Sequence, residues 1–282
     1  MDTNQKVLST MTGYEIMATI EALEKQGLNV SSFKLLRQDK NLAEEVANLI
    51  LSKQFQPRID DQQFLSIMGK ENYFGPTEWF RHFNVYLEIE LPISMHRLTQ
   101  IANGDCPFEK GKKVKDTHFL FCLPKKIETS TIDRYMNINT WRKILPAKGQ
   151  PKFIGGNTIP SPSSNKAPWY ENLGFATNPK HRYDWFLMYK GILPSYFSTP
   201  ERPIESWDQY FRPNTIECIS MHFQYYVKNK TYLNPSEFGR TCDLMPDNNE
   251  GDFVAVGNFD KIGLSISWGN MYTGYFLSRK LT

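Results

Sequence analysis

The last forty residues of the chain constrain its fold most strongly, because short apolar runs there are separated by regularly spaced glycines. Residues 253–256 are apolar, residues 264–268 alternate apolar and small polar side chains, and residues 275–277 are aromatic and aliphatic. Short runs bounded by turn residues are typical of β-strands. The separating glycines are Gly251, Gly257, Gly263, Gly269 and Gly274. This pattern predicts a meander of short strands over residues 252–280.

The alternating run gives the predicted sheet two different faces. Leu264, Ile266 and Trp268 share one face, which we expect to pack on a core, so Ser265 and Ser267 point outward. Tyrosine provides contact area with few rotatable bonds, and small polar side chains provide hydrogen bonds, so this composition suits an adaptable binding surface. An ordinary solvated sheet face would have the same composition. The turns around this face add Asn258, Asp260, Asn270, Tyr272, Thr273 and Tyr275.

The end of the chain, with Trp268 followed by residues 274–280 (GYFLSRK), resembles the carboxy-terminal ends of variable proteins from diversity-generating retroelements. This phage and prokaryotic family has a C-type-lectin-like fold that displays diversified residues as a ligand-binding patch. The resemblance implies a receptor-like protein for an unknown macromolecular or glycan ligand, without a cofactor. The positions that it implies for ligand binding are Asn258, Asp260, Ser265, Ser267, Asn270, Tyr272, Thr273 and Tyr275.

Strand and helix signals alternate through the middle of the chain. Residues 83–91 alternate in the manner of a half-buried strand, and residues 117–123 are apolar enough for a strand buried on both faces. Residues 129–144 resemble a helix. In residues 214–230, Asn214 and Glu217 form a capping box ahead of an apolar stripe. The mixture predicts an α+β fold with antiparallel strands and helices.

Two irregular segments set the expected domain organisation. Residues 55–76 contain several glycines and prolines, which mark a boundary between modules. Residues 146–168 are rich in proline, glycine and serine, so they predict a long loop. We therefore expect a C-type-lectin-like α+β domain over residues 77–282, with a separate module over residues 1–56.

The first module reads as a helical hairpin over residues 12–53. Two capping boxes open its helices, and Gly27 ends the first of them. A DNA-binding helix-turn-helix is one interpretation, but acidic residues occupy the start of the second helix, where a phosphate-facing surface would be basic. We therefore expect a docking role, or homo-oligomerisation through this hairpin. The boxes are Thr12 with Glu15 and Asn41 with Glu44.

Charge and hydropathy exclude two classes of partner. The formal net charge is +3, from 33 basic and 30 acidic residues, so a polyanion-binding signature is missing and nucleic acid is not expected. The sequence contains no apolar run of about 18 residues and no signal-peptide pattern at its start. We expect no membrane insertion and a cytoplasmic or virion-associated protein.

An enzyme is the main alternative. Formylglycine-generating oxidases share the C-type-lectin-like fold and use a cysteine pair near the carboxy end, where this chain has Cys218 and Cys242. The four cysteines form no CxxC pair, and the five histidines show no metal-binding spacing, so we expect no metal site. Neither a Ser-His-Asp arrangement nor a paired acidic motif stands out, so we expect no catalytic residues. A structural protein of a phage or cell-envelope particle is a third possibility.

Overall fold

The computed structural model describes residues 30–44, 59–85, 87, 91–128, 133–146, 148–154, 168–177, 184–194, 209–245, 252–269 and 274–281. The chain divides into two units. The first holds Met1–Gln56 and Glu128–Asp133, and the second holds Pro57–Ile127 and Arg134–Thr282.

The described residues of the first unit before Gln56 are helical. Helix α2 spans Val30–Gln38, and a second helical stretch covers residues 40–44. Asp39 caps that stretch, because its Oδ1 accepts hydrogen bonds from Asn41 N at 3.0 Å and Leu42 N at 3.1 Å. Asn41 was expected to be the cap and instead lies inside the helix. The box of Thr12 with Glu15 and the helix end at Gly27 lie outside the described residues.

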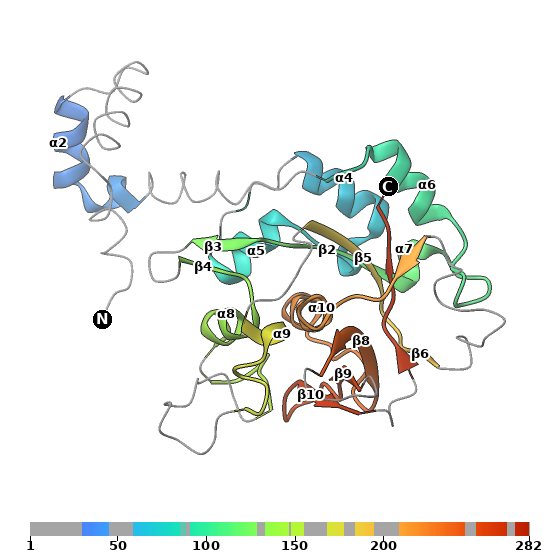
Figure 1. The fold of residues 1–282 in the computed structure, drawn as a ribbon. Coiled ribbons are helices and arrows are strands. Elements are labelled where there is room, and N and C mark those ends of the chain that lie inside the picture. The colour runs from blue at the N-terminus through green and yellow to red at the C-terminus, as the bar shows by residue number, and fades with distance from the viewer. Residues whose placement is uncertain are drawn as a thin grey trace. The chain divides into compact units, whose positions relative to one another are not determined.

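The second unit contains two five-stranded sheets, which confirms the α+β fold class (Figure 1). The first sheet has the order β1-β2-β5-β12-β7, with β1 parallel to β2 and the other neighbours antiparallel. Every residue of β2 is buried, as predicted for residues 117–123. The strands are β1 Tyr73–Phe74, β2 His118–Leu123, β5 Asp184–Tyr189, β7 Tyr210–Phe211 and β12 Ser278–Arg279.

The second sheet has the order β10-β9-β8-β11-β6. Strands β8, β9 and β10 form an antiparallel meander, whereas β11 runs parallel to β8. The strands are β6 Leu193–Pro194, β8 Phe238–Leu244, β9 Phe253–Gly257, β10 Ser265–Trp268 and β11 Gly274–Tyr275. A separate two-stranded ladder joins β3 Lys126–Glu128 and β4 Asp133–Tyr135.

Helix α10, Thr215–Asn229, lies between the two sheets and contacts β2 on one side and β8 and β9 on the other (Figure 1). Its predicted capping box is confirmed: Asn214 Oδ1 accepts from Glu217 N, and Glu217 Oε2 accepts from Asn214 N, both at 3.0 Å. The helix is buried nearly all round, as a helix covered on both sides must be. None of the described helices is long and apolar enough to cross a membrane.

Shorter helices surround this core. Helices α4, α6 and α7 contact one another, and α8 contacts α9, which also contacts α10. They span α4 Ile59–Met68, η3 Lys70–Asn72, α5 Pro76–Phe83, α6 Met95–Asn103, α7 Val114–Thr117, α8 Ile138–Ile144 and α9 Gly174–Thr177.

Three sequence predictions in this unit were wrong in part. Phe83 ends helix α5 and does not begin a strand, because Pro76 opens that helix and Asn84 closes it in the left-handed conformation at φ 55°. The segment 55–76, expected to be irregular, contains α4 and β1. The expected helix over residues 129–144 is instead strand β4 followed by α8, which starts at the N-cap Asn137.

The carboxy-terminal stretch differs from a simple meander. Strand β11 belongs to the second sheet and β12 to the first, so the tail joins both sheets. Leu264 and Ile266 are buried as predicted. Trp268 was expected in the core but is 47% exposed, because it ends the edge strand of its sheet.

Candidate functional site

Cross-strand pairing brings residues of four strands into one row on the second sheet. Ser267 pairs with Ala255, Ala255 with Arg240, and Arg240 with Tyr275. Paired residues on neighbouring strands lie on the same face, and so do residues two apart along one strand. We call this side of the sheet the outer face, with Ser265, Ser267, Ala255, Phe253, Arg240 and Tyr275.

The opposite face of the same sheet belongs to the core. The alternate row contains Ile266, Val256 and Gly239, and Val256 is fully buried, as is Ala255 in the row of the outer face. Burying a valine or isoleucine contributes about 1.5–3 kcal/mol. The ring of Phe276 lies so close to Gly239 that a Cβ there would come within 2.5 Å of it, so only glycine fits. Helix α10 packs on this side through β8 and β9, and the outer face therefore points away from it.

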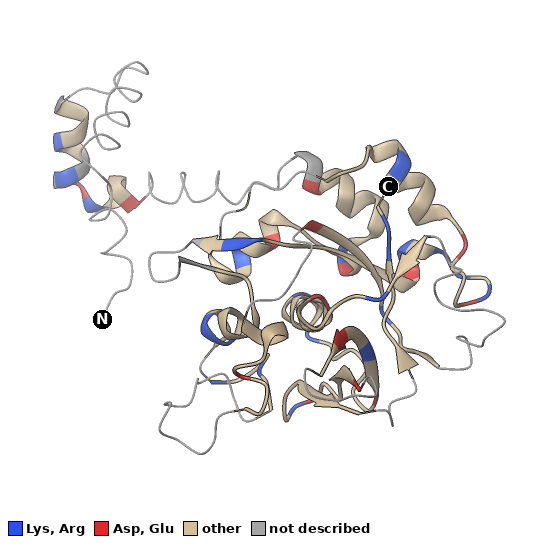
Figure 2. Ribbon diagram, in the orientation of Figure 1, with Lys and Arg blue, Asp and Glu red and all other residues tan. Residues whose placement is uncertain are grey.

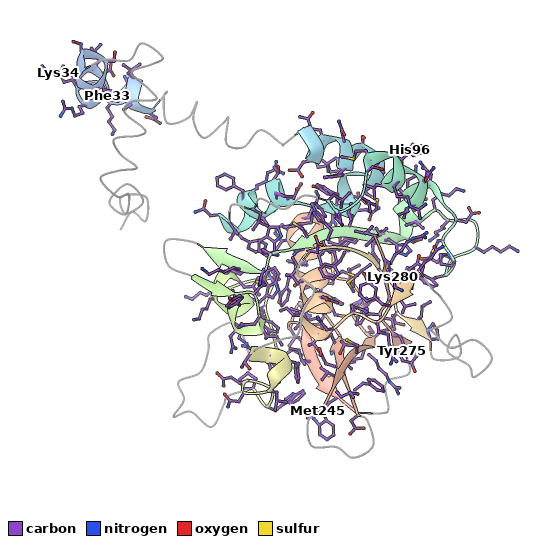
Figure 3. The ribbon with its side chains drawn as sticks, turned by 45° about the horizontal axis from the view of Figure 1, so that its top comes forward. Phe33, Lys34, His96, Met245, Tyr275 and Lys280 are labelled. Carbon is purple, nitrogen blue, oxygen red and sulfur yellow. The ribbon has the colours of Figure 1, made fainter. Side chains whose placement is uncertain are left out.

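Two arginines meet two aromatic rings on the outer face. Arg240 Cζ lies 5.7 Å from the ring centroid of Phe253 and 5.6 Å from that of Tyr275. Arg212, in the loop before α10, joins them, with Cζ 5.3 Å and 5.8 Å from the same two centroids. All four side chains are half-buried, and Tyr275 is labelled in Figure 3. Each such contact contributes about 0.5–1 kcal/mol and fixes the guanidinium orientation.

Asp243, on the same strand as Arg240, contacts helix α10. Strand β8 carries both a basic and an acidic residue (Figure 2). The acidic one, Asp243, accepts a hydrogen bond from Thr215 N at 2.7 Å through Oδ2, at the first turn of α10. A carboxylate there is stabilised by the helix dipole.

The structure brings together three of the eight predicted site residues, Ser265, Ser267 and Tyr275. Asn258 and Asp260 lie in the turn after β9 and stabilise it through hydrogen bonds. Asn258 adopts φ 47° and donates its backbone N–H to Glu237 O, and Asp260 Oδ1 accepts from Ile262 N at 2.6 Å. Both residues are half-buried. The other three predicted residues, Asn270, Tyr272 and Thr273, lie outside the described part of the chain.

Sequence reasoning missed Arg212, Arg240 and Phe253. Arg240 lies beside Tyr275 because β11 runs parallel to β8. This pairing joins distant segments, so no local sequence pattern predicts it. The alternation Phe238, Arg240, Cys242 along β8 is the one signal that could have placed Arg240 on a sheet face.

The cysteines of the oxidase alternative are protonated thiols in this fold. Cys218 is fully buried on α10, and burial raises its pKa well above the ordinary value. Cys242 is an exposed residue of β8, and partial desolvation of its thiol, with the carboxylates of Asp243 and Glu217, raises its pKa to about 12. Nucleophilic and metal-binding cysteines need a lowered pKa. The pKa values of this pair are therefore shifted in the direction opposite to that of a reactive cysteine site.

A second charged group lies inside the unit. We call Asp61, Tyr73, Thr77, Glu78 and Lys228 the buried ion cluster. Lys228 Nζ lies 2.8 Å from Glu78 Oε1, and their side chains are 8% and 4% exposed. Asp61 accepts hydrogen bonds from the hydroxyls of Tyr73 and Thr77 and from Thr77 N. Burial lowers the pKa of Lys228, and Glu78 opposes that shift. Each charge here is paired or hydrogen-bonded, which is typical of a structural cluster.

His118 occupies a closed aromatic site. It is fully buried, with Nδ1 2.9 Å from Thr117 Oγ1 and Nε2 3.1 Å from Tyr210 Oη. Phe108 stacks on its ring at 6.0 Å. Burial, with the nearby Arg279, lowers its pKa to about 3, so the ring is neutral at pH 7. Because both ring nitrogens already face hydroxyls, His118 is a packed residue and not a free base.

Within the described ranges, no group of three or more His, Cys, Asp or Glu residues is placed to hold a metal ion. Comparison with protein-family models, with curated proteins and with solved structures finds no match to this chain.

Proposed function

We propose that this protein binds a glycan or another macromolecular ligand through the outer face of its second sheet, without catalysing a reaction. The observation that supports the proposal is the strand register that aligns Ser267, Arg240 and Tyr275 on the face directed away from α10. Aromatic and arginine side chains are the residues that most often dominate binding energy at interfaces. Ser265 and Ser267 add hydroxyl donors and acceptors beside them.

We further propose that the α+β unit is a C-type-lectin-like scaffold of the kind used by diversity-generating retroelements. Support comes from the resemblance of the chain end and from the position of Ser265, Ser267 and Tyr275 on one face. The gene neighbourhood tests this part: a reverse transcriptase gene and a near-copy of the end of this gene are expected nearby. A neighbourhood that lacks both would contradict the retroelement assignment and leave the ligand-binding proposal in place.

Binding to an array of glycans tests the function itself. The double variant Ser265→Arg with Ser267→Arg places two bulky side chains on the outer face and should weaken wild-type binding at least tenfold. Ser66 and Ser236 are exposed outside the second sheet, so Ser66→Arg with Ser236→Arg adds the same charge elsewhere and should leave binding unchanged. Failure of the wild-type chain to bind any glycan would contradict a glycan ligand, and equal losses in both double variants would contradict the outer face as the binding site.

A further inference from the structure

Most of the exposed large hydrophobic side chains in the described part of the chain gather along one strand. Strand β10 forms an edge of the second sheet (Figure 1). Ile262 precedes this strand and Trp268 ends it, and their side chains are 59% and 47% exposed. Ile154 and Trp169 reach the same strand from an earlier part of the chain and are 44% and 42% exposed. We call these four residues the edge patch.

Hydrogen bonds to β10 and the residue before it fix the position of the edge patch. Ile154 N donates to Leu264 O at 3.0 Å, and Trp169 Nε1 donates to Ile266 O at 3.4 Å. Both acceptors lie between the two ends of the patch, so its residues follow one line of about 20 Å at the usual rise per residue. The same hydrogen bonds engage main-chain carbonyls at the strand edge. A partner would therefore meet side chains here and would not add a strand to the sheet.

The edge patch has the composition of an interface core. The sequence from Gly263 to Gly269 contains no charged residue. At about 200 Å² for each large side chain, the exposed fractions of the four residues amount to roughly 400 Å². Apolar patches of this size on a monomer are often functional. Interface cores are likewise depleted of charge and enriched in tryptophan.

The charged residues differ between the two halves of the edge patch. Lys261 is exposed beside Ile262, whereas Asp260 Oδ1 in the same turn accepts from Ile262 N at 2.6 Å. Glu171 is half-buried two residues after Trp169, in the other half. A two-fold axis across the strand sets each half against the opposite half of a second copy. Lys261 then faces the acidic half, and two lysines do not meet.

We propose that the edge patch is an interface between two copies of this chain, packed so that Ile262 of each copy meets Trp268 of the other. A surface without charge at its centre is complementary to itself, and most oligomers consist of copies of one chain. The patch supplies about half of the ~800 Å² that each partner buries in a standard interface, so the dimer should be weak and reversible. This inference is separate from the ligand-binding face and from the oligomerisation expected of the amino-terminal hairpin.

Sedimentation velocity of the full chain tests the interface. The wild-type chain should pass from monomer to dimer between about 1 µM and about 500 µM. Ile262→Lys and Trp268→Glu each bury an unpaired charge between the copies, so each should weaken the dimer at least tenfold. Mixed in equal amounts, the two variants set a lysine against a glutamate at one contact and keep the wild-type pair at the other. The mixture should therefore dimerise at least tenfold more tightly than either variant alone.

Tyr135→Glu and Leu35→Glu are the matched controls, because these side chains are 59% and 56% exposed and are not part of the edge patch. Tyr135 lies on β4 and Leu35 on α2. Both variants should dimerise like the wild-type chain. Thermal melts identify any variant that fails to fold, and Trp169→Glu then supplies the disruption in its place.

The outcomes separate this interface from other uses of the edge patch. A wild-type chain that is monomeric at every concentration, or a dimer that neither Ile262→Lys nor Trp268→Glu weakens, would overturn it. An equal loss in Leu35→Glu would assign the dimer to the amino-terminal hairpin. A mixture that dimerises no better than its components would overturn the two-fold arrangement. A monomer whose glycan binding is lost in Trp268→Glu would assign the patch to ligand binding instead.

Discussion

The buried ion cluster and the outer face hold their charged side chains in different surroundings. In the cluster, Lys228 meets Glu78 and the hydroxyls of Tyr73 and Thr77 surround Asp61, so the interior satisfies its own charges. On the outer face, Arg212 and Arg240 share the same two aromatic rings while the neighbouring Asp243 is held by α10. The charges of the cluster stabilise the interior, whereas the two arginines lie on a half-buried sheet face in contact with aromatic rings.

This comparison makes different predictions for stability in the two regions. Substitutions in the cluster should destabilise the fold, because an uncompensated charge remains buried. Substitutions on the outer face should leave the fold nearly intact and weaken binding.

The largest effect is expected at the buried ion pair. Glu78→Gln keeps an oxygen acceptor for Gly75 N but leaves the Lys228 cation buried without its counter-charge, so the free energy of unfolding should fall by about 3–5 kcal/mol. Urea denaturation measures the change. The double variant Glu78→Gln with Lys228→Met removes both charges and should recover much of the loss. If the single and double variants are equally unstable, the pairing of charge is not what stabilises this region.

Protonation of His118 should change the free energy of unfolding by a smaller amount per pH unit. Its folded-state pKa of about 3 is below the ordinary 6.5, so its stabilising contribution is complete above about pH 6.5 and is lost as the pH falls toward 3. In this window a single group changes the free energy of unfolding by about 1.4 kcal/mol per pH unit. His118→Gln should reduce the pH slope by this amount. Unchanged slopes between pH 4 and 6 would show that His118 titrates normally.

Substitutions on the two faces of the second sheet should differ in their effect on the free energy of unfolding, by a smaller amount than in the two cases above. Thr241 is fully buried, and its Oγ1 contacts Thr215 Oγ1 at 3.1 Å and donates to Val254 O at 3.0 Å. Thr241→Val should therefore cost about 1–3 kcal/mol, since it leaves buried partners unsatisfied. Ser265→Ala, at a half-buried position on the outer face, should change the free energy of unfolding by less than about 0.5 kcal/mol. Chemical denaturation measures both variants. A larger loss of unfolding free energy in the serine variant than in Thr241→Val would contradict the assignment of the buried and outer faces.

Local sequence signals predicted the parts of the fold that depend on local interactions. The apolar run of β2, the capping box of α10 and the alternation of β10 are each visible within a few residues, and the structure contains all three. The alternation also predicted that Ser265 and Ser267 share a face opposite Ile266, because the period of a strand is two.

Signals of the same kind failed where distant segments decide the outcome. The alternating run over residues 83–91 resembles a strand, but Phe83 ends a helix whose Trp79 packs against Trp141 at 5.4 Å. Trp268 continues the apolar alternation, yet the edge of the sheet leaves it exposed. The meeting of Arg240 with Tyr275 depends on parallel pairing across 35 positions of sequence, which local patterns do not encode.

The most direct test of this account compares two adjacent residues on opposite sides of the chain. Phe276 is fully buried against Gly239 and the ring of His222, whereas Tyr275 lies half-buried between the arginines. Urea denaturation should show that Phe276→Ala lowers the free energy of unfolding by about 3–5 kcal/mol, as loss of a core aromatic does. Tyr275→Ala should lower it by only about 1 kcal/mol, because it loses cation–π contacts at a partly exposed site. Equal losses for the two variants would contradict the account, since Tyr275 would then be a core residue and not part of a binding face.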